Sequence, residues 1–329
     1  MRTVNILGLG HYVPSNIVTN DDLSKVVDTS DEWIFSRTGI KERRISKYEN
    51  TTDLAVEAAR LAIKDCNICP KSIDLIVVGT VTPDYFVPST ACLVQERLGA
   101  VNATCFDINA ACSGYIYGIN VASQFLKTNQ SKIALVIGVD IMSKVLNWND
   151  RSTCVLFGDG ASAVVLGIGN YGGIISMYTG SDGSKGNSLF IPGIPLKNVI
   201  VSFNQSVANE INMQGSDVFK FATNAIITSI NTILNNSSTS LSEIKYIICH
   251  QANYRIIEYV AKKLNINIDK FYINLQKYGN TSAASIGIAF DEVYITGQLS
   301  KGDKVILVGF GGGFTWGSIL VQWTKEKIM

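Results

Sequence analysis

Hydrophobic and polar positions follow two different periods within residues 53–80, "DLAVEAARLAIKDCNICPKSIDLIVVGT". The first part repeats its apolar positions every three to four residues, which predicts an amphipathic helix, and the last part is a β-branched run typical of a buried strand. Residues 218–251, "VFKFATNAIITSINTILNNSSTSLSEIKYIICHQ", follow the same order of helix, polar turn and strand. The chain therefore carries two similar segments far apart.

These segments align at an offset of 171 residues. Ile73 of the first segment corresponds to Ile244 of the second. Further on, Lys132 of "SKIALVIGVD" corresponds to Asp303 of "GDKVILVGFG" at the same offset. Two independent matches at one offset indicate an internal duplication.

Strands that alternate with helices in each half predict an α/β protein with mainly parallel sheets. The turn-rich sequence "GIGNYGG" predicts the junction between the halves. We therefore expect two domains, residues 1–170 and residues 171–329, joined side by side with a site shared between them.

Composition narrows the function classes. Of the 329 residues, 47% are hydrophobic and 17% are charged, and the formal net charge is +1, which favours a compact enzyme over a disordered chain. No strongly basic field is present to recruit nucleic acid. Neither a signal peptide nor a run of about 18 apolar residues is apparent, so we expect a cytoplasmic protein that does not cross a membrane.

The seven cysteines do not suggest a disulfide framework, because their number is odd and they are spread along the chain. "CNIC", from Cys66 to Cys69, lacks a second pair that would complete a zinc site. We interpret it as the surface end of a helix, expect no metal site, and leave a redox role open.

Cys112 begins the sequence "CSGYIYGINVASQF", whose apolar positions have helical spacing. A cysteine at a helix N-terminus is a candidate nucleophile, because the helix dipole favours a thiolate and lowers the thiol pKa from its usual value of about 8.5. Free cysteines are also common in protein cores, so a small buried side chain is the alternative interpretation of this segment taken alone.

Two further polar residues fall at strand ends. His250 follows the apolar strand of the second segment directly, a position where α/β proteins gather functional groups. A satisfied core histidine is the alternative, and His11 lies in a polar loop. Asn280 lies 171 residues after Asn109, so the duplication places "NTSAASIG" opposite "NAACSGYIYG" and Asn280 close to Cys112.

The glycine run "VGFGGGFTWGS", residues 308–318, follows a strand of the second half. Glycines allow backbone to approach a ligand closely and to present N–H donors, as an oxyanion hole requires, although a tight turn would look the same. We assign Asp159 of "FGDGAS" a turn role. The motifs of the common nucleotide-phosphate loops are absent.

Taken in order, "DTSDEWIFSRTGIKER", "NAACSGY", "FGDGA", "HQANYRI", "GNTSAAS" and "GFGGGFTWGS" resemble the 3-oxoacyl-[acyl-carrier-protein] synthase III family, and the similarity covers essentially the whole chain. The resemblance implies a thiolase-like homodimer with a layered αβαβα core. It implies that the enzyme condenses acyl-CoA, with acetyl-CoA the expected primer, with malonyl-acyl carrier protein (malonyl-ACP) to start fatty acid synthesis, without a cofactor.

The resemblance also assigns roles to residues. The nucleophile would be Cys112, the donors to the malonyl thioester carbonyl His250 and Asn280, and the oxyanion donors the backbone N–H groups of Cys112 and Gly312. For coenzyme A it implies two residues that flank the adenine, Trp33 and Arg37, and five along the pantetheine path, Arg151, Gly215, Phe219, Ala252 and Asn253.

The acidic carrier protein would dock on a basic face made by Lys220, Arg255, Lys262 and Lys263, although a solvated helix face is the alternative interpretation of the lysines. In this family a loop from the dimer mate limits acyl length, and here that loop would be "VTPDYFVPST", with Phe86 and Val87 at its tip. The sequence leaves open a branched or longer primer, and with it a related enzyme of secondary metabolism. A degradative thiolase is disfavoured because the glycine run carries no second cysteine.

Overall fold

Two β-sheets with the same strand order form the centre of the computed structural model, which describes residues 3–195, 200 and 209–326. In this part of the chain the first sheet has five strands in the order β1 (Thr3–Tyr12), β7 (Asp159–Gly169), β6 (Ile133–Ile141), β4 (Leu75–Gly79) and β5 (Thr104–Ile108). The second has four, β8 (Gly173–Ser181), β13 (Thr315–Gln322), β12 (Lys304–Gly311) and β11 (Ile244–Cys249).

The duplication predicted from the sequence is confirmed by element boundaries that recur 171 residues apart. The short 3-10 turn η2 (Ala111–Ser113) and helix α5 (Gly114–Lys127) correspond to η7 (Ser282–Ala284) and α9 (Ser285–Ile295). The turn η1 (Pro70–Ser72) corresponds likewise to η5 (Leu241–Glu243). Even a rare backbone conformation repeats, because Ala111 has a φ of 45° and Ser282 a φ of 50°.

The prediction of mainly parallel sheets is wrong. Among the described strands, β4 pairs in parallel with β5 and β6, and β11 with β12, but β7 and β13 run antiparallel to their neighbours on both sides. Each of these two strands returns beside the preceding one without a crossover helix, and antiparallel pairing permits that shorter connection.

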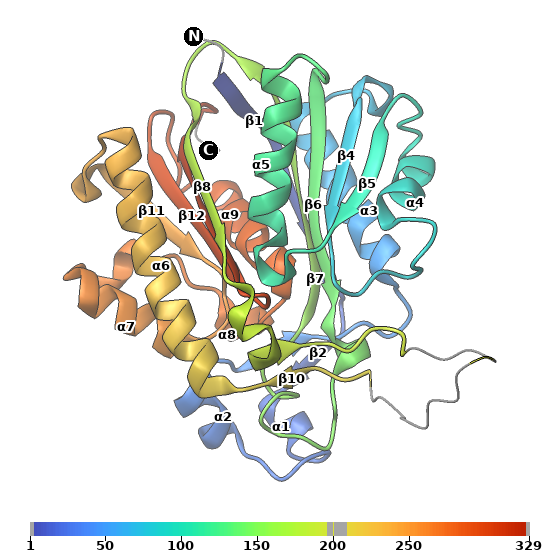
Figure 1. The fold of residues 1–329 in the computed structure, drawn as a ribbon, viewed down its shortest axis with the longest axis vertical. Coiled ribbons are helices and arrows are strands. Elements are labelled where there is room, and N and C mark those ends of the chain that lie inside the picture. The colour runs from blue at the N-terminus through green and yellow to red at the C-terminus, as the bar shows by residue number, and fades with distance from the viewer. Residues whose placement is uncertain (1–2, 196–199, 201–208, 327–329) are drawn as a thin grey trace.

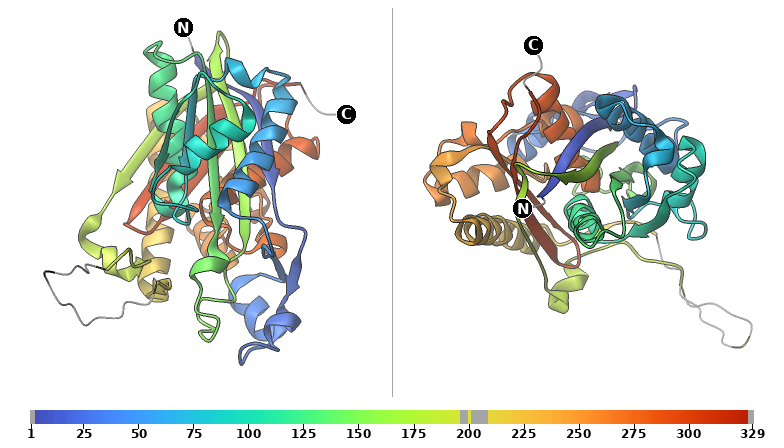
Figure 2. Two further views of the ribbon diagram at one scale, coloured as in Figure 1. Left: turned by 90° about the vertical axis from the view of Figure 1, so that its right-hand side faces the viewer. Right: turned by 90° about the horizontal axis from the view of Figure 1, so that it is seen from above.

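Helices cover both outer faces of the sheets and fill the space between them (Figures 1 and 2). Helices α3 (Thr51–Cys66) and α4 (Thr90–Leu98) lie outside the first sheet, and α6 (Gly215–Ser237) and α7 (Tyr254–Leu264) lie outside the second. Helices α5 and α9 contact both sheets. Because α9 lies between two sheets it is apolar nearly all round, and ten consecutive residues from Ser285 to Tyr294 are buried.

Smaller elements gather at the lower end of Figure 1, where the parallel strands end. They comprise α1 (Asn20–Leu23), α2 (Asp31–Thr38), α8 (Leu275–Tyr278), β2 (Ile17–Thr19), β3 (Glu42–Arg44), β9 (Leu189–Phe190), β10 (Asn212–Met213), η3 (Met142–Val145) and η4 (Gly183–Ser188). Parallel strands bring their loops together at this edge, which is where ligands bind in α/β sheets. The turn η6 (Ile268–Lys270) lies instead beside the start of β11, where Lys270 donates to the carbonyl of Ile244.

In the part of the chain that the structure describes, no helix has both the length and the apolar character that a membrane span requires. All seven cysteines are free. Cys66 is the last residue of α3 and Cys69 is exposed, so "CNIC" lies at the surface end of a helix, as predicted.

Candidate active site

A cavity of about 740 Å³ opens at the carboxyl ends of the parallel strands. Cys112, His250 and Asn280 all line it, each from a different element: Cys112 from η2, His250 from the end of β11, and Asn280 from the loop before η7. Gly312, from the turn between β12 and β13, also lines the cavity. The four residues predicted to be catalytic are therefore brought to one place.

Close packing of the glycine run against η2 brings these elements together. A Cβ atom added to Gly311 would lie 2.6 Å from the backbone N of Cys112, and one added to Gly309 would lie 3.2 Å from the Cα of Ser113. Only glycine permits such an approach of two backbones. The predicted use of the glycine run was a close approach of backbone to a ligand, whereas Gly311 allows a close approach to the backbone of Cys112.

The Cys112 thiol is nearly inaccessible, and its electrostatics differ from the sequence-based expectation. Burial is the main cause of a pKa raised to about 12, a hydrogen bond from Ser282 opposes the rise, and the nearby charge of Asp140 adds to it. The expected pKa below 8.5 is therefore wrong for this structure. Loss of hydration outweighs the favourable field of the helix N-terminus.

Asn280 has its side-chain amide oriented by one hydrogen bond. Its Oδ1 accepts the N–H of Ser282 at 2.9 Å, and an NH₂ group cannot accept a hydrogen bond, so the oxygen and nitrogen are distinguished by their chemistry. Its backbone is held as well, because its N–H donates to the carbonyl of Leu156 at 2.9 Å and its carbonyl accepts from Gly158 at 3.0 Å. The Nδ2 group is left to act as a donor in the cavity.

The tautomer of His250 follows from its contact with Ser285. The Nδ1 of His250 lies 2.6 Å from the Oγ of Ser285, and the same Oγ accepts the N–H of Gln251 at 3.3 Å. With the Ser285 hydroxyl as the donor in this contact, Nδ1 carries no proton and Nε2 carries one. Burial lowers the pKa of His250 to about 3, so the ring is a neutral Nε2–H donor.

The residues expected to bind coenzyme A form two groups. Gly215, Phe219, Ala252 and Asn253 line the cavity. Trp33 lies apart from the lining, with the Arg37 guanidinium carbon 4.5 Å and that of Arg151 5.0 Å from its ring centre. Arg151, expected along the pantetheine path, is therefore placed with Trp33 at the outer end. Its Nη1 donates to the carbonyl of Asp28 at 2.8 Å.

The four basic residues expected to dock the carrier protein differ in their surroundings. Arg255 donates to the carbonyl of Ser36 through Nε at 3.1 Å and Nη2 at 2.8 Å, which ties α7 to α2. Lys262 pairs with Glu258 at 3.3 Å, and the Lys263 Nζ lies 5.5 Å from the ring centre of Tyr259. Both of these lysines lie in the last turn of α7, and Lys220 is exposed on α6.

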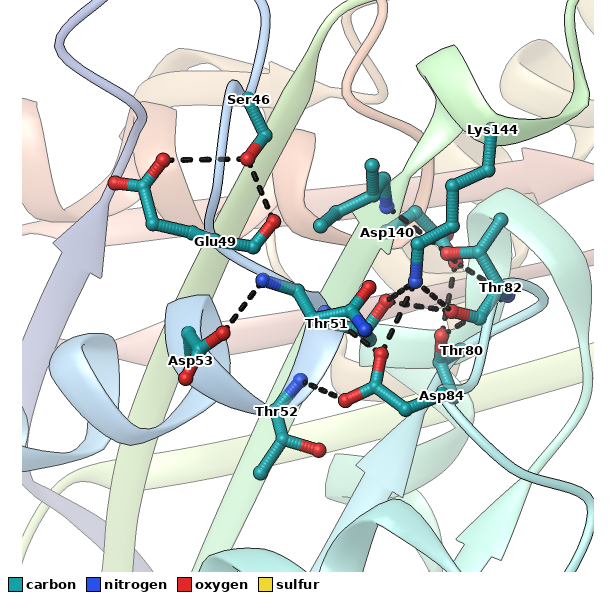
Figure 3. Close-up of polar contacts among 12 residues, drawn as sticks. Ser46, Glu49, Thr51, Thr52, Asp53, Thr80, Thr82, Asp84, Asp140 and Lys144 are labelled. Carbon is teal, nitrogen blue, oxygen red and sulfur yellow. Dashed lines mark hydrogen bonds and ion pairs between the residues drawn. The ribbon is translucent and has the colours of Figure 1, made fainter.

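The loop expected to control acyl length lies at the cavity of its own chain. Phe86 lines the cavity yet is 76% exposed, and Val87 is 87% exposed. Asp84 anchors the base of the loop: its carboxylate accepts the N–H groups of Thr51 and Thr52 at the start of α3, both at 2.9 Å, and pairs with Lys144 at 3.0 Å (Figure 3). The loop tip is thus apolar, exposed and held at its base.

Asp159 contributes to the framework of the site, but it is the first residue of β7 and not part of a turn, so the predicted turn role is wrong. The buried carboxylate accepts from the backbone N–H of Ser46 at 2.8 Å and from the N–H and hydroxyl of Ser143 at 3.0 and 2.7 Å. These contacts hold the loops around the start of β7. Within residues 3–195, 200 and 209–326, no three His, Cys, Asp or Glu side chains gather in a way that could hold a metal ion.

Comparison with known proteins explains this arrangement. Residues 106–183 match the family described as 3-oxoacyl-[acyl-carrier-protein (ACP)] synthase III, and residues 234–323 match the C-terminal region of the same family. A beta-ketoacyl-[acyl-carrier-protein] synthase III from Clostridium acetobutylicum is 54% identical over 325 residues, which cover 99% of this chain and 100% of that protein. The chain belongs to the 3-oxoacyl-[acyl-carrier-protein] synthase III family.

Solved structures agree with this assignment. The crystal structure of 3-oxoacyl-[acyl-carrier-protein] synthase III from Aquifex aeolicus superimposes with a TM-score of 0.91 at 43% identity, covering 97% of this chain and 100% of that one. A priming beta-ketosynthase of the R1128 polyketide pathway gives a TM-score of 0.91 at 30% identity, covering 98% and 97%. The family, the thiolase-like fold and the class of activity, a condensing acyltransferase of fatty acid biosynthesis, are therefore confirmed.

Proposed function

We propose that this enzyme transfers the acyl group of acyl-CoA, with acetyl-CoA as the primer, to Cys112 and condenses it with malonyl-ACP to give 3-oxoacyl-ACP, carbon dioxide and coenzyme A. The observation that carries the proposal is the meeting of a buried thiol with two oriented side-chain donors, on His250 and Asn280, in one cavity. Relatives that cover the whole chain carry the name of this synthase.

In the first half-reaction, the sulfur of Cys112 attacks the thioester carbon of acyl-CoA. The developing oxyanion would be held by the backbone N–H groups of Cys112 and Gly312, which both line the cavity. Preorganised donors of this kind are worth most in a site from which water is excluded. Coenzyme A then leaves, and the acyl group stays on the sulfur as a thioester.

In the second half-reaction, malonyl-ACP loses carbon dioxide and its enolate attacks the acyl group on Cys112. The enolate oxygen needs hydrogen-bond donors, and the Nε2–H of His250 and the Nδ2–H of Asn280 are the groups that their other contacts leave available. A neutral histidine suits this role, because it donates without requiring a second charge in a buried site. Decarboxylation itself supplies the carbanion, so no base is required for this step and we propose that no cofactor is needed.

Coenzyme A would lie with its pantetheine arm along Gly215, Phe219, Ala252 and Asn253 and its adenine at Trp33. Asn253 joins these two regions, because its Nδ2 donates to the carbonyl of Arg37 at 3.1 Å. The guanidinium carbons of Arg37 and Arg151 lie 4.5 and 5.0 Å from the ring centre of Trp33. An adenine would replace one of these groups on the indole face. This assigns Arg37 and Arg151 to the adenine end.

We further propose that the carrier protein docks beside the cavity on the basic residues of α6 and α7. Lys220 and Arg255 lie within a few residues of Phe219, Ala252 and Asn253, which line the cavity. Lys262 and Lys263 lie six to seven residues beyond Ile256, roughly 10 Å along the helix. They would therefore meet a more distant part of the carrier protein.

The chain would act as a homodimer in the cytoplasm, with residues 1–170 and 171–329 as its two domains. β5 is the edge strand of its sheet and its residues are partly exposed, which leaves a row of backbone groups for a second copy to pair with. The exposed Phe86 and Val87 offer apolar surface in the same half of the chain. Seven free cysteines suit a reducing compartment.

Assay of wild type and Asn280→Asp with acetyl-CoA and malonyl-ACP tests the proposal. The aspartate keeps an oxygen that can accept the Ser282 N–H but has no N–H to donate. We expect wild type to release carbon dioxide and 3-oxoacyl-ACP in equal amounts, and the variant to condense about 100-fold more slowly while Cys112 still becomes acylated. Condensation at the wild-type rate would contradict the donor role.

A related condensing enzyme of secondary metabolism with another primer is the second candidate, because the priming ketosynthase of a polyketide pathway shares the fold at 30% identity. Comparing acyl-CoAs of increasing length at equal concentration distinguishes the two. A preference for acetyl-CoA favours fatty acid synthesis, whereas exclusive use of a longer or unusual primer favours the alternative.

A further inference from the structure

A hydroxyl group contacts the sulfur of Cys112 from the opposite half of the molecule. The Oγ of Ser282 lies 3.4 Å from the Sγ of Cys112, and Ser282 is 1% exposed. Ser282 occupies the position that corresponds to Ala111 in the duplicated half, and both residues have a positive φ. The backbone conformation at this position therefore does not require a serine.

Asp140, near the end of β6, lies behind this serine. Its Oδ1 accepts from the hydroxyls of Thr80 and Thr82, both at 3.0 Å, and from the N–H groups of Val81 at 2.8 Å and Thr82 at 3.2 Å (Figure 3). Its Oδ2 accepts the N–H of Ala283 at 3.3 Å. The Ser282 hydroxyl also interacts with the carboxylate, which opposes the rise in pKa that burial causes. Oδ1 thus accepts four hydrogen bonds, whereas Oδ2 accepts fewer and is the oxygen that can bind a proton.

A hydroxyl has one proton, so Ser282 cannot donate to both neighbours at once. In the structure the Ser282 hydroxyl donates to the sulfur. If it turns to donate to Asp140 and accepts the S–H of the neutral Cys112 thiol, each contact has a proton. Asp140 is fully buried. Burial also raises the pKa of its carboxyl group, which makes it a better proton acceptor than an exposed aspartate.

A buried carboxylate beside the nucleophile otherwise poses a difficulty. The charge of Asp140 raises the pKa of Cys112 and so opposes formation of a thiolate. If Asp140 itself takes the proton from Cys112, the two residues together carry one negative charge before and after the transfer. The charge of Asp140 then no longer opposes formation of the thiolate. His250, which also lines the cavity, is a poor proton acceptor because its pKa is lowered to about 3.

We propose that Asp140 is the base for Cys112 and that Ser282 relays the proton between them. This inference rests on the proposed role of Cys112 as the acyl carrier. As the sulfur attacks the thioester carbon, the S–H bond breaks, its proton passes to the Oγ of Ser282, and the former Ser282 proton passes to the Oδ2 of Asp140. The S–C bond forms, and coenzyme A leaves as a thiolate that takes a proton from water.

The same path returns the proton in the second half-reaction. When the enolate attacks the acyl group, the acyl–sulfur bond breaks and Cys112 leaves with the electron pair. Asp140 then gives its proton back through Ser282, and the free thiol is restored. Asp140 and Ser282 therefore complete a cycle in which the proton is stored on Asp140 while the acyl group is on the cysteine.

The test is the pH dependence of Cys112 alkylation by iodoacetamide, followed by intact mass and peptide mapping, in wild type, Ser282→Ala and Ser113→Ala. Ser113 is an equally buried hydroxyl next to the cysteine, but it contacts Ala110 and Thr315. We expect alkylation of wild type and Ser113→Ala to change little between pH 7 and 9. In Ser282→Ala we expect it to be at least tenfold slower at pH 7 and to rise about tenfold per pH unit, because only the small thiolate fraction reacts.

Asp140→Asn separates a relay from a purely electrostatic effect, because the two predict opposite signs. Removing a charge that only opposes the thiolate would speed alkylation, whereas removing the proton acceptor slows it at least tenfold. In the double variant the two losses should not add, since either one breaks the relay. If Asp140→Asn does not fold, the comparison of the alkylation profiles of Ser282→Ala and Ser113→Ala is sufficient to test the relay.

Faster alkylation of Asp140→Asn, or equal profiles for Ser282→Ala and Ser113→Ala, overturns the relay. Alkylation reports on the thiol without acyl-CoA. Failure of the relay is therefore distinguishable from failure of the proposed function, which would appear as an absent acyl adduct on the wild-type protein.

Discussion

The Nδ1 atom of His250 lies 2.6 Å from the Oγ of Ser285, the first residue of α9, and this contact sets which ring nitrogen carries the proton. Ser285 corresponds to Gly114 in the duplicated half, which has no side chain to offer. The two halves therefore share a backbone plan but differ in chemistry: one half presents the thiol, and the other presents the histidine and the residue that orients it.

Replacing Ser285 with alanine should affect condensation more than acylation. Without the hydroxyl, Nδ1 can hold the proton and Nε2–H is lost as a donor, so we expect the condensation kcat to fall roughly 100-fold while acylation of Cys112 changes little. Ser285→Thr keeps the hydroxyl and should recover much of the rate. ¹⁵N NMR of the histidine ring should show the Nε2–H tautomer in wild type; finding the Nδ1–H tautomer there would contradict this interpretation.

Gly311→Ala should disturb the nucleophile through its backbone. The added Cβ would lie 2.6 Å from the backbone N of Cys112, a contact that forces the strand and η2 apart. We expect acylation to slow more than tenfold and the free energy of unfolding to fall by about 1–3 kcal/mol. Gly183→Ala is the matched control, because its Cβ would meet no atom within 4 Å. Equal acylation rates in the two variants would refute the close approach.

Burial of His250 should make stability depend on pH in a predictable direction. Its pKa is about 3 in the folded protein, against about 6.5 for an unperturbed histidine, so the unfolded chain binds one more proton between these values. As the pH falls from 6.5 towards 3, His250 should therefore cost about 1.4 kcal/mol of stability per pH unit. Urea unfolding of wild type and His250→Gln measures the difference between the two slopes, and parallel slopes would contradict it.

Charge reversal on α7 tests the docking of the carrier protein. For Lys262→Glu and Lys263→Glu we expect the KM for malonyl-ACP to rise several-fold and the KM for acyl-CoA to stay unchanged, because only the carrier protein would meet this face. Lys71→Glu, an exposed residue of η1 far along the chain from α7, serves as the control. Equal effects of the α7 variants on both substrates would exclude specific docking there.

Spacing along the chain was sufficient to predict the duplication and, through it, the meeting of Cys112 and Asn280. The offset of 171 carried that prediction, because equivalent residues of a duplicated fold occupy equivalent places. His250 was a candidate because it directly follows an apolar strand, and motif resemblance added Gly312 and the role of each residue. All four residues line one cavity in the structure.

Other features depend on contacts that spacing does not report. Asp140 lies near the end of a buried strand and Ser282 lies two residues after Asn280, and only the folded chain brings Ser282 to the sulfur of Cys112 and Asp140 beside Ala283. The direction of the Cys112 pKa shift was mispredicted for the same reason, because local sequence indicates a helix N-terminus but not the extent of burial. Antiparallel pairing of β7 and β13 was also missed, since continuous apolar strands do not disclose their direction.

Acylation of Cys112 tests the central claim most directly. Purified wild type and Cys112→Ala are incubated with acetyl-CoA and a series of longer and branched acyl-CoAs, and intact mass followed by peptide mapping locates any adduct. We predict one acyl group per chain on Cys112 of wild type, none on Cys112→Ala, and loss of the adduct when malonyl-ACP is added. A folded wild-type protein that gains no adduct from any acyl-CoA, or gains it on another residue, would contradict the account.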